Sequence, residues 1–161
     1  MGIFKIKGGK KLKGDIRVQG AKNEALQVIC ACLLTTEEVI INNIPDILDV
    51  NNLIELISSL GVKVTKKSKG SYSFIAKDID LQYIRSKEFI KSGAALRGSV
   101  MILGPLLSRT GVIHMPKPGG DKIGRRRLDT HFTGFEKLGA QFDYDFNNDF
   151  YTLSGRNLQG A

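Results

Sequence analysis

The sequence contains two related stretches, GAKNEALQVICACLLTTEEVII at residues 20–41 and GAALRGSVMILGPLLSRTGVIH at residues 93–114. A shift of 73 positions, from residue 20 to residue 93, superimposes their Gly-Ala, Leu-Leu and Val-Ile pairs. After five extra residues around 116–121 the similarity resumes, and residues 60–62 match residues 138–140. Self-similarity at a fixed shift is typical of a chain built from copies of one supersecondary unit. The sequence therefore predicts two copies.

Each copy is expected to run strand, helix, strand, helix, strand, strand, which is an α/β (more narrowly α+β) pattern. In the first copy, alternating polarity predicts a strand at 15–19, and an almost wholly apolar run predicts a buried helix at 21–34. The remaining predicted elements are a strand at 39–41, a helix capped by Asp49 and ended by Gly61, and a hairpin of residues 62–65 and 72–76.

The second copy predicts helices near 93–107 and 127–138 and a hairpin over Asn147-Asn148. The last four residues, LQGA, resemble the LKGD at 12–15 that opens the first copy. We interpret them as the start of a third copy, and an ordinary polar C-terminal tail is the alternative. The predicted boundaries are 14–78 for the first copy, 79–156 for the second and 158–161 for the start of the third.

The chain is basic, with 24 Lys and Arg against 16 Asp and Glu, a formal net charge of +8. Such a balance indicates a polyanionic partner: nucleic acid, an anionic membrane or a phosphorylated small molecule. The longest apolar run is far shorter than a membrane helix, and no signal peptide begins the chain. Cys30 and Cys32 point to different faces of the expected helix and cannot form a disulfide. We expect a reduced, cytoplasmic protein without a metal site.

Cations lie at three expected helix starts: Lys22, Arg97 about one turn into its helix, and residues 125–127. A helix N-terminus already carries unpaired N–H groups and partial positive charge, so added cations indicate bound phosphates or carboxylates. Asn23 adds an amide donor. A solvated surface lysine is the alternative for Lys22, and a nucleic-acid patch is the alternative for the arginine triplet at 125–127. The basic residues show no interleaved aromatic platform, which speaks against nucleic acid.

Asp121 lies between two glycines and a run of cations, in the stretch GGDKIGRRR at 119–127. Aspartate beside glycine is common in turns, and that is one interpretation. The other is a proton donor on a mobile loop.

Three motifs carry a resemblance to a known family: GAKN at 20–23, LR at 96–97 followed by LGPLL at 103–107, and PGGDKIGRR at 118–126. Together they resemble the UDP-N-acetylglucosamine 1-carboxyvinyltransferases, enolpyruvyl transferases of bacterial peptidoglycan synthesis. The resemblance covers essentially all 161 residues. It implies two domains, each of three repeated units around an inside-out pseudo-threefold axis. Residues 1–20 would pack with the other domain, and residues 21–161 would supply about two units of the first.

The resemblance implies transfer of enolpyruvyl from phosphoenolpyruvate to the 3′-hydroxyl of UDP-N-acetylglucosamine, with release of phosphate. The reaction proceeds by addition and elimination and needs no metal or organic cofactor. The partners implied are these two substrates and the C-terminal domain of the same protein, not nucleic acid or a membrane. Because that domain supplies the base and further arginines, we expect the 161 residues alone to be inactive.

The resemblance also assigns roles to residues of this sequence. Lys22, Asn23 and Arg126 match positions that bind phosphoenolpyruvate. The positions that bind UDP-N-acetylglucosamine are Asn23, Arg97, Arg126, Arg127, Leu128, Asp129 and Thr130. Asp121 takes the place of the cysteine that protonates the methylene carbon of phosphoenolpyruvate.

Two positions depart from the family pattern. A free aspartic acid, with a pKa of about 3.9, is ionised at pH 7. Asp121 therefore needs its pKa raised by desolvation or by the substrates' negative charges, whereas the neighbouring arginines lower it. Epoxide antibiotics such as fosfomycin, which alkylate the cysteine, should not inactivate an enzyme with aspartate there. The second departure is Arg127, where many members have proline.

Two alternatives remain. The shikimate-pathway enolpyruvyl transferase has a similar architecture, but it calls for a Gly-Asn-x-Gly-Thr type segment where this chain has SGAAL at 92–96. A stand-alone basic module that binds anions or RNA is the alternative from a different class. A steep loss of RNA affinity with salt, and no response to a UDP-sugar, would favour it.

Overall fold

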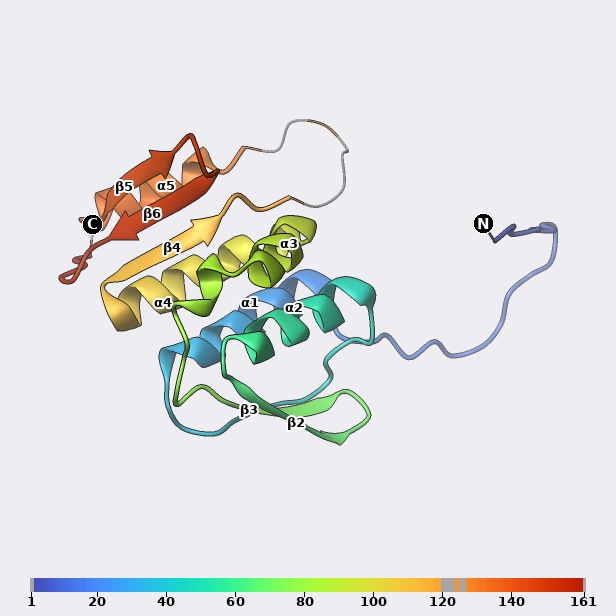
Figure 1. Cartoon of the computed structure of the whole chain (residues 1–161). Coiled ribbons are helices and arrows are strands. Elements are labelled where there is room, and N and C mark those ends of the chain that lie inside the picture. Colours follow the sequence, from blue (N-terminus) through green and yellow to red (C-terminus); the bar gives the residue numbers. More distant parts are fainter. Residues whose placement is uncertain (1, 120–123, 125–126, 161) are drawn as a thin grey trace.

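The computed structural model describes residues 2–119, 124 and 127–160. The predictions for Asp121, Arg125 and Arg126 therefore lie outside the described residues. Two three-stranded antiparallel sheets enclose a layer of helices between them (Figure 1). The α/β class predicted from the sequence is confirmed.

The first half contains α1 (Lys22–Ala31), which continues as the 3₁₀ helix η1 (Cys32–Leu34), β1 (Val39–Ile41), α2 (Leu48–Ser59), β2 (Lys63–Ser68) and β3 (Ser71–Ile75). Its sheet has the order β1-β3-β2, and Phe74 of the central strand pairs with Val39 on one side and Val64 on the other. The predicted helix at 21–34, the strand at 39–41 and the hairpin are confirmed.

The second half contains η2 (Tyr83–Arg85), α3 (Lys87–Ala95), η3 (Arg97–Ile102), α4 (Leu103–Thr110), β4 (Val112–Pro116), α5 (Asp129–Lys137), β5 (Gln141–Asp145) and β6 (Phe150–Ser154). The sheet order is β4-β6-β5, with the last strand in the centre as in the first half. The predicted hairpin over residues 147–148 is confirmed. One helix–strand–helix–hairpin topology thus occurs twice.

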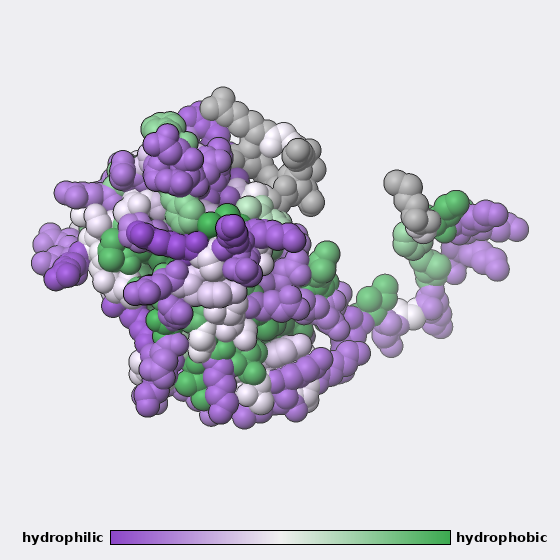
Figure 2. Space-filling view, viewed as in Figure 1, coloured by the Kyte–Doolittle hydropathy of each residue, from purple (hydrophilic) through white to green (hydrophobic). Residues whose placement is uncertain are grey.

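The predicted strand at 15–19 is wrong. Residues 2–19 form no helix or strand and extend away from the body of the molecule (Figure 1). Ile16 and Val18 are 92% and 83% exposed, and Figure 2 shows hydrophobic and hydrophilic residues side by side along this segment. Alternating polarity favours a strand only when a neighbouring strand pairs with its backbone N–H and C=O groups, and within the described part of the chain no strand lies beside this segment.

The predicted continuous helix at 93–107 is also wrong, because the helical conformation is interrupted at Leu96. Leu96 has extended backbone angles (φ −118°, ψ 116°) that end α3. The buried Ser99 hydroxyl lies 2.9 Å from the Gly93 carbonyl oxygen and 2.7 Å from that of Leu96, so it bridges the last turn of α3 and the start of η3. Arg97 therefore begins η3 and does not lie one turn into a helix.

Asp49 does not cap its helix as predicted. The residue before α2 is Ile47, which offers no side-chain cap, and Asp49 lies within the first turn. A carboxylate is still favoured there by the partial positive charge of the helix start.

Apolar side chains of the central helices form one core. Its fully buried members include Ile29, Leu33, Leu53, Ile57, Leu103, Leu106 and Leu107. Arg109, near the end of α4, joins the two halves by donating hydrogen bonds to the carbonyl oxygens of Leu33 (3.2 Å), Lys77 (3.0 Å) and Ala76. The halves therefore share apolar contacts and the polar connections that Arg109 makes.

Two glycines lie directly against backbone carbonyl oxygens, one just before α1 and one after β4. A Cβ atom at Gly20, just before α1, would overlap the carbonyl oxygen of Asn43, which follows β1. In the second half, a Cβ atom at Gly119 would overlap the carbonyl oxygen of Ala94 in α3. Glycine is required at both places because only a residue without a side chain allows such contact.

Candidate anion-binding site

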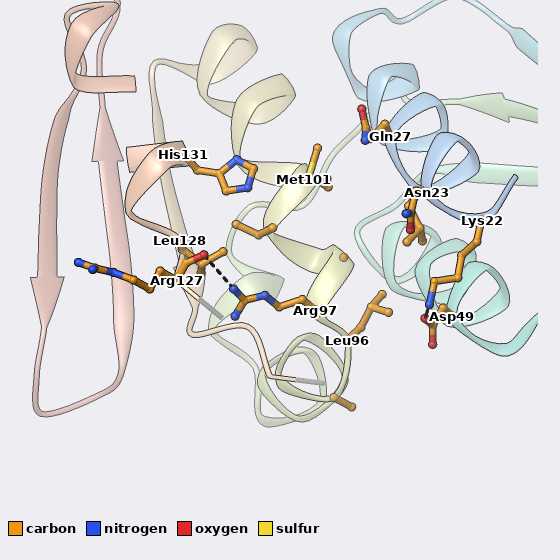
Figure 3. Close-up of a pocket in the computed structure, with 14 residues that line it drawn as sticks. Lys22, Asn23, Gln27, Asp49, Leu96, Arg97, Met101, Arg127, Leu128 and His131 are labelled. Carbon is orange, nitrogen blue, oxygen red and sulfur yellow. Dashed lines mark hydrogen bonds and ion pairs between the residues drawn. The ribbon is translucent and has the colours of Figure 1, made fainter. Parts of the chain in front are cut away.

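A cavity of about 350 Å³ opens between the start of α1 and the segment that leads from α3 into η3 (Figure 3). It brings together residues from all three parts of the chain in which the sequence places cations: Lys22 and Asn23, then Arg97, then Arg127 and Leu128. The positions of Asp121 and Arg126, predicted to join them, lie outside the described residues. Asp129 and Thr130 do not line this cavity.

One wall comes from the starts of α1 and α2, which pack against each other. Lys22 is the first residue of α1, and the preceding Ala21 provides no side-chain cap. The Lys22 ammonium forms an ion pair with the carboxylate of Asp49, in the first turn of α2 (Figure 3). Asn23 and Gln27 line the same wall, one helical turn apart.

The opposite wall is built around Arg97. Its Nη2 donates a hydrogen bond to the backbone carbonyl oxygen of Arg127 over 3.3 Å. The Arg127 side chain extends away from the cavity in Figure 3, and its Nε pairs with the carboxylate of Asp129. Asp129 therefore holds Arg127, while the main chain of Arg127 faces Arg97. Thr130 is exposed in the first turn of α5.

The lining is electropositive. Among its described residues, the charged side chains that face the cavity are two cations, Lys22 and Arg97, and one carboxylate, that of Asp49, while Arg127 contributes its main chain. Cations and helix-start N–H groups in one cavity favour phosphate and carboxylate ligands.

Sequence reasoning missed several lining residues: Gln27, Asp49, Met101 and His131. For Gln27 a signal exists, because a residue four positions after Asn23 shares its helix face. For Asp49 the signal was partial: the sequence predicted it as the cap of this helix, and the structure places it in the first turn of the same helix.

A second cavity of about 630 Å³ adjoins the first and shares Arg97, Arg127 and Leu128 with it. Its aromatic lining consists of Phe132, Phe142, Tyr144, Phe146 and Tyr151. The Tyr144 and Tyr151 ring centroids are 5.0 Å apart, and the Lys117 ammonium lies 5.9 Å from the centre of the Tyr144 ring. The expectation that no aromatic platform accompanies the basic residues is therefore wrong here. Strand alternation at 142 and 144 is the signal that could have shown it.

The remaining titratable groups bear on other chemistries. Burial raises the pKa of the Cys32 thiol to about 11 and raises that of Cys30 further. Among the described residues, no three His, Cys, Asp or Glu side chains are grouped so that they could hold a metal ion. Along the described ranges 2–119 and 127–160, no helix has the length and apolar composition needed to cross a bilayer.

The fold and the cavity can now be compared with those of known proteins to find the class of protein to which the chain belongs. The model of the EPSP synthase (3-phosphoshikimate 1-carboxyvinyltransferase) family matches residues 6–161, and the chain belongs to this family. Two solved structures share the fold. The enolpyruvyl transferase NikO from Streptomyces tendae has a TM-score of 0.68 at 21% identity, covering 94% of this chain and 32% of its own. EPSP synthase from Acinetobacter baumannii has a TM-score of 0.55 at 13% identity, covering 96% and 35%.

Relatives with higher sequence identity carry a more particular name. The UDP-N-acetylglucosamine 1-carboxyvinyltransferases of Bacteroides thetaiotaomicron and Bacteroides fragilis are each 56% identical over 161 residues, and that of Porphyromonas gingivalis is 54% identical. These matches cover 100% of this chain and 37% of each relative, so the chain spans little more than a third of their length. The resemblance that the three sequence motifs carry is confirmed.

Proposed function

We propose that the chain forms part of an enzyme that transfers enolpyruvyl from phosphoenolpyruvate to the 3′-hydroxyl of UDP-N-acetylglucosamine and releases phosphate. The observation that carries this proposal is the cavity that unites Lys22, Asn23 and Arg97. These residues come from separate motifs, and both substrates are anions that such a lining favours. The names of the 54–56% identical relatives support the same reaction.

Within this proposal the residues have distinct roles. Lys22 and Arg126 bind the phosphate and carboxylate of phosphoenolpyruvate, and Asn23 contacts both substrates. Arg97 and the segment 126–130 bind the nucleotide sugar. Positive groups arranged before the reaction hold the two anionic substrates together, and they stabilise the negative charge of the phosphate that leaves as the ketal intermediate collapses. Asp121 donates the proton to the methylene carbon, and its carboxyl group must be protonated for that step.

The proposal extends to the organisation of the protein. Residues 21–161 would form repeats 14–78 and 79–156 and the start of a third at 158–161, and residues 1–20 would pack with a C-terminal domain. The apolar side chains exposed on residues 2–19 support that packing, since isolated protein surfaces rarely expose so many together. The product would enter peptidoglycan synthesis in the bacterial cytoplasm.

A chimera tests the proposed reaction. Residues 1–161 replace the matching first 37% of the Bacteroides fragilis relative, and phosphate release is measured with both substrates. We expect turnover by the chimera, at least a hundredfold loss in its Lys22→Met variant, and no release by the 161 residues alone. A folded but inactive chimera would contradict the proposed reaction. Turnover by the chain alone would contradict its dependence on a C-terminal domain.

Two alternatives are tested in parallel. The net charge of +8 and the aromatic rings beside Arg97 are the observations that favour an RNA-binding or anion-binding module. RNA affinity that falls steeply with salt, without any response to UDP-N-acetylglucosamine, would favour that module. Replacing the acceptor with shikimate 3-phosphate in the chimera assay tests the shikimate-pathway reaction.

A further inference from the structure

Asp49 is the one acidic side chain among the described residues that line the anion-binding cavity. Its carboxylate forms an ion pair with the Lys22 ammonium. In the proposed function, Lys22 is one of the residues that bind phosphoenolpyruvate. We propose that Asp49 is a resident counter-ion: it pairs with Lys22 when no anion is bound and releases Lys22 to an anionic ligand. This inference rests on the proposed function, because it takes the cavity to be the anion site.

The position of Asp49 suits such an exchange. It lies in the first turn of α2, whose N-terminus has no side-chain cap. The partial positive charge of that helix start stabilises the Asp49 carboxylate even after Lys22 has moved away. Releasing Lys22 therefore does not leave an uncompensated carboxylate.

The position of Lys22 suits it as well. The side chains of Lys22 and Asp49 are 50% and 41% exposed, so water screens the pair and their mutual attraction is weak. Lysine carries its charge on a flexible four-carbon stem, and the ammonium can turn from Asp49 toward the cavity. Arg97 stands on the opposite wall (Figure 3), so a ligand between the walls meets two cations.

The exchange has a consequence for affinity. A ligand must displace the Asp49 carboxylate to reach the Lys22 ammonium, so Asp49 lowers the affinity of every anion that binds at Lys22.

The test is a titration of the 161-residue chain with phosphoenolpyruvate, followed by ¹H–¹⁵N NMR at low salt. We expect Asp49→Asn to bind roughly three- to tenfold more tightly than the wild type, with a smaller difference at high salt. Lys22→Met should bind more weakly, and adding Asp49→Asn to it should change the affinity less than twofold. Glu55→Gln, the same charge change on the exposed side of α2, is the matched control and should leave the affinity unchanged.

Equal or weaker binding by Asp49→Asn would overturn the inference, as would undetectable binding by that variant. Tightening that persists in the Lys22→Met background would also overturn it, because the effect would then not pass through Lys22. A role of Asp49 in stability alone predicts weaker binding, so the direction of the change separates the two. The chimera decides the proposed reaction independently of this titration.

Discussion

Arg97 donates a hydrogen bond to the main-chain carbonyl oxygen of Arg127, 30 positions later in the sequence. The Arg127 side chain points elsewhere and pairs with Asp129. One wall of the cavity is therefore joined to the start of α5 through backbone. This explains how the chain can carry arginine at a position where the resembled family often has proline, since either residue provides the same carbonyl group.

The first prediction concerns these two arginines. Arg97→Ala removes both a cavity cation and the hydrogen bond to residue 127, and we expect UDP-N-acetylglucosamine affinity to fall at least tenfold. Arg127→Ala retains the carbonyl acceptor, and its effect should stay within about threefold. Calorimetric titration of the chimera measures both. A larger loss in Arg127→Ala than in Arg97→Ala would show that the side chain matters more than the backbone.

The second prediction concerns the polar connection between the halves. Arg109→Met leaves the carbonyl oxygens of Leu33, Ala76 and Lys77 without their shared donor. We expect the free energy of unfolding in urea to fall by about 2–4 kcal/mol. Arg17→Met, in the exposed N-terminal segment, removes the same charge and should leave stability unchanged. Equal stability of both variants would show that Arg109 does not connect the halves.

The third prediction concerns the close approach at the start of α1. Gly20→Ala places a methyl group against the Asn43 carbonyl oxygen and should lower the free energy of unfolding by about 1–3 kcal/mol. Gly134→Ala, in α5 with open space around its Cα, should be neutral or stabilise by up to about 1 kcal/mol. Thermal unfolding of the two variants side by side gives the comparison.

The fourth prediction concerns pH. Burial raises the pKa of Cys32 from 9.0 to about 11 in the folded chain. Between these values the unfolded chain loses a proton that the folded chain keeps, so the folded state loses stability as pH rises from about 9 to 11. The native thiols should react with Ellman's reagent at pH 8 at least a hundredfold more slowly than in urea. Rapid native labelling would contradict their burial.

The fifth prediction follows from the expected role of Asp121, which lies outside the described residues. The chimera should resist fosfomycin, and Asp121→Cys should make it sensitive because a thiol opens the epoxide ring and becomes alkylated. Activity remaining after incubation measures both, and mass spectrometry locates the adduct. Rapid inactivation of the unmodified chimera with label on Asp121 would reject the prediction.

Local patterns in the sequence determined most of the elements. The apolar run at 21–34, the short strand at 39–41 and the two hairpins depend on periodicity and turn residues, which act over a few positions. The repeated topology could also be predicted from the sequence, because the stretches 20–41 and 93–114 carry the same local signals. The cations of the cavity could be identified for the same reason, because residue type and position at an expected helix start can both be seen in a short stretch of sequence.

Only the tertiary structure decided the rest. Residues 15–19 alternate as a strand does, yet a strand exists only where another backbone pairs with it. The break at Leu96 depends on the Ser99 hydroxyl reaching back to two carbonyl oxygens. Asp49 meets Lys22 across 27 positions, and Arg97 meets the Arg127 carbonyl across 30. Such pairs form only when packed helices bring distant residues together. Composition and spacing along the chain therefore do not predict them.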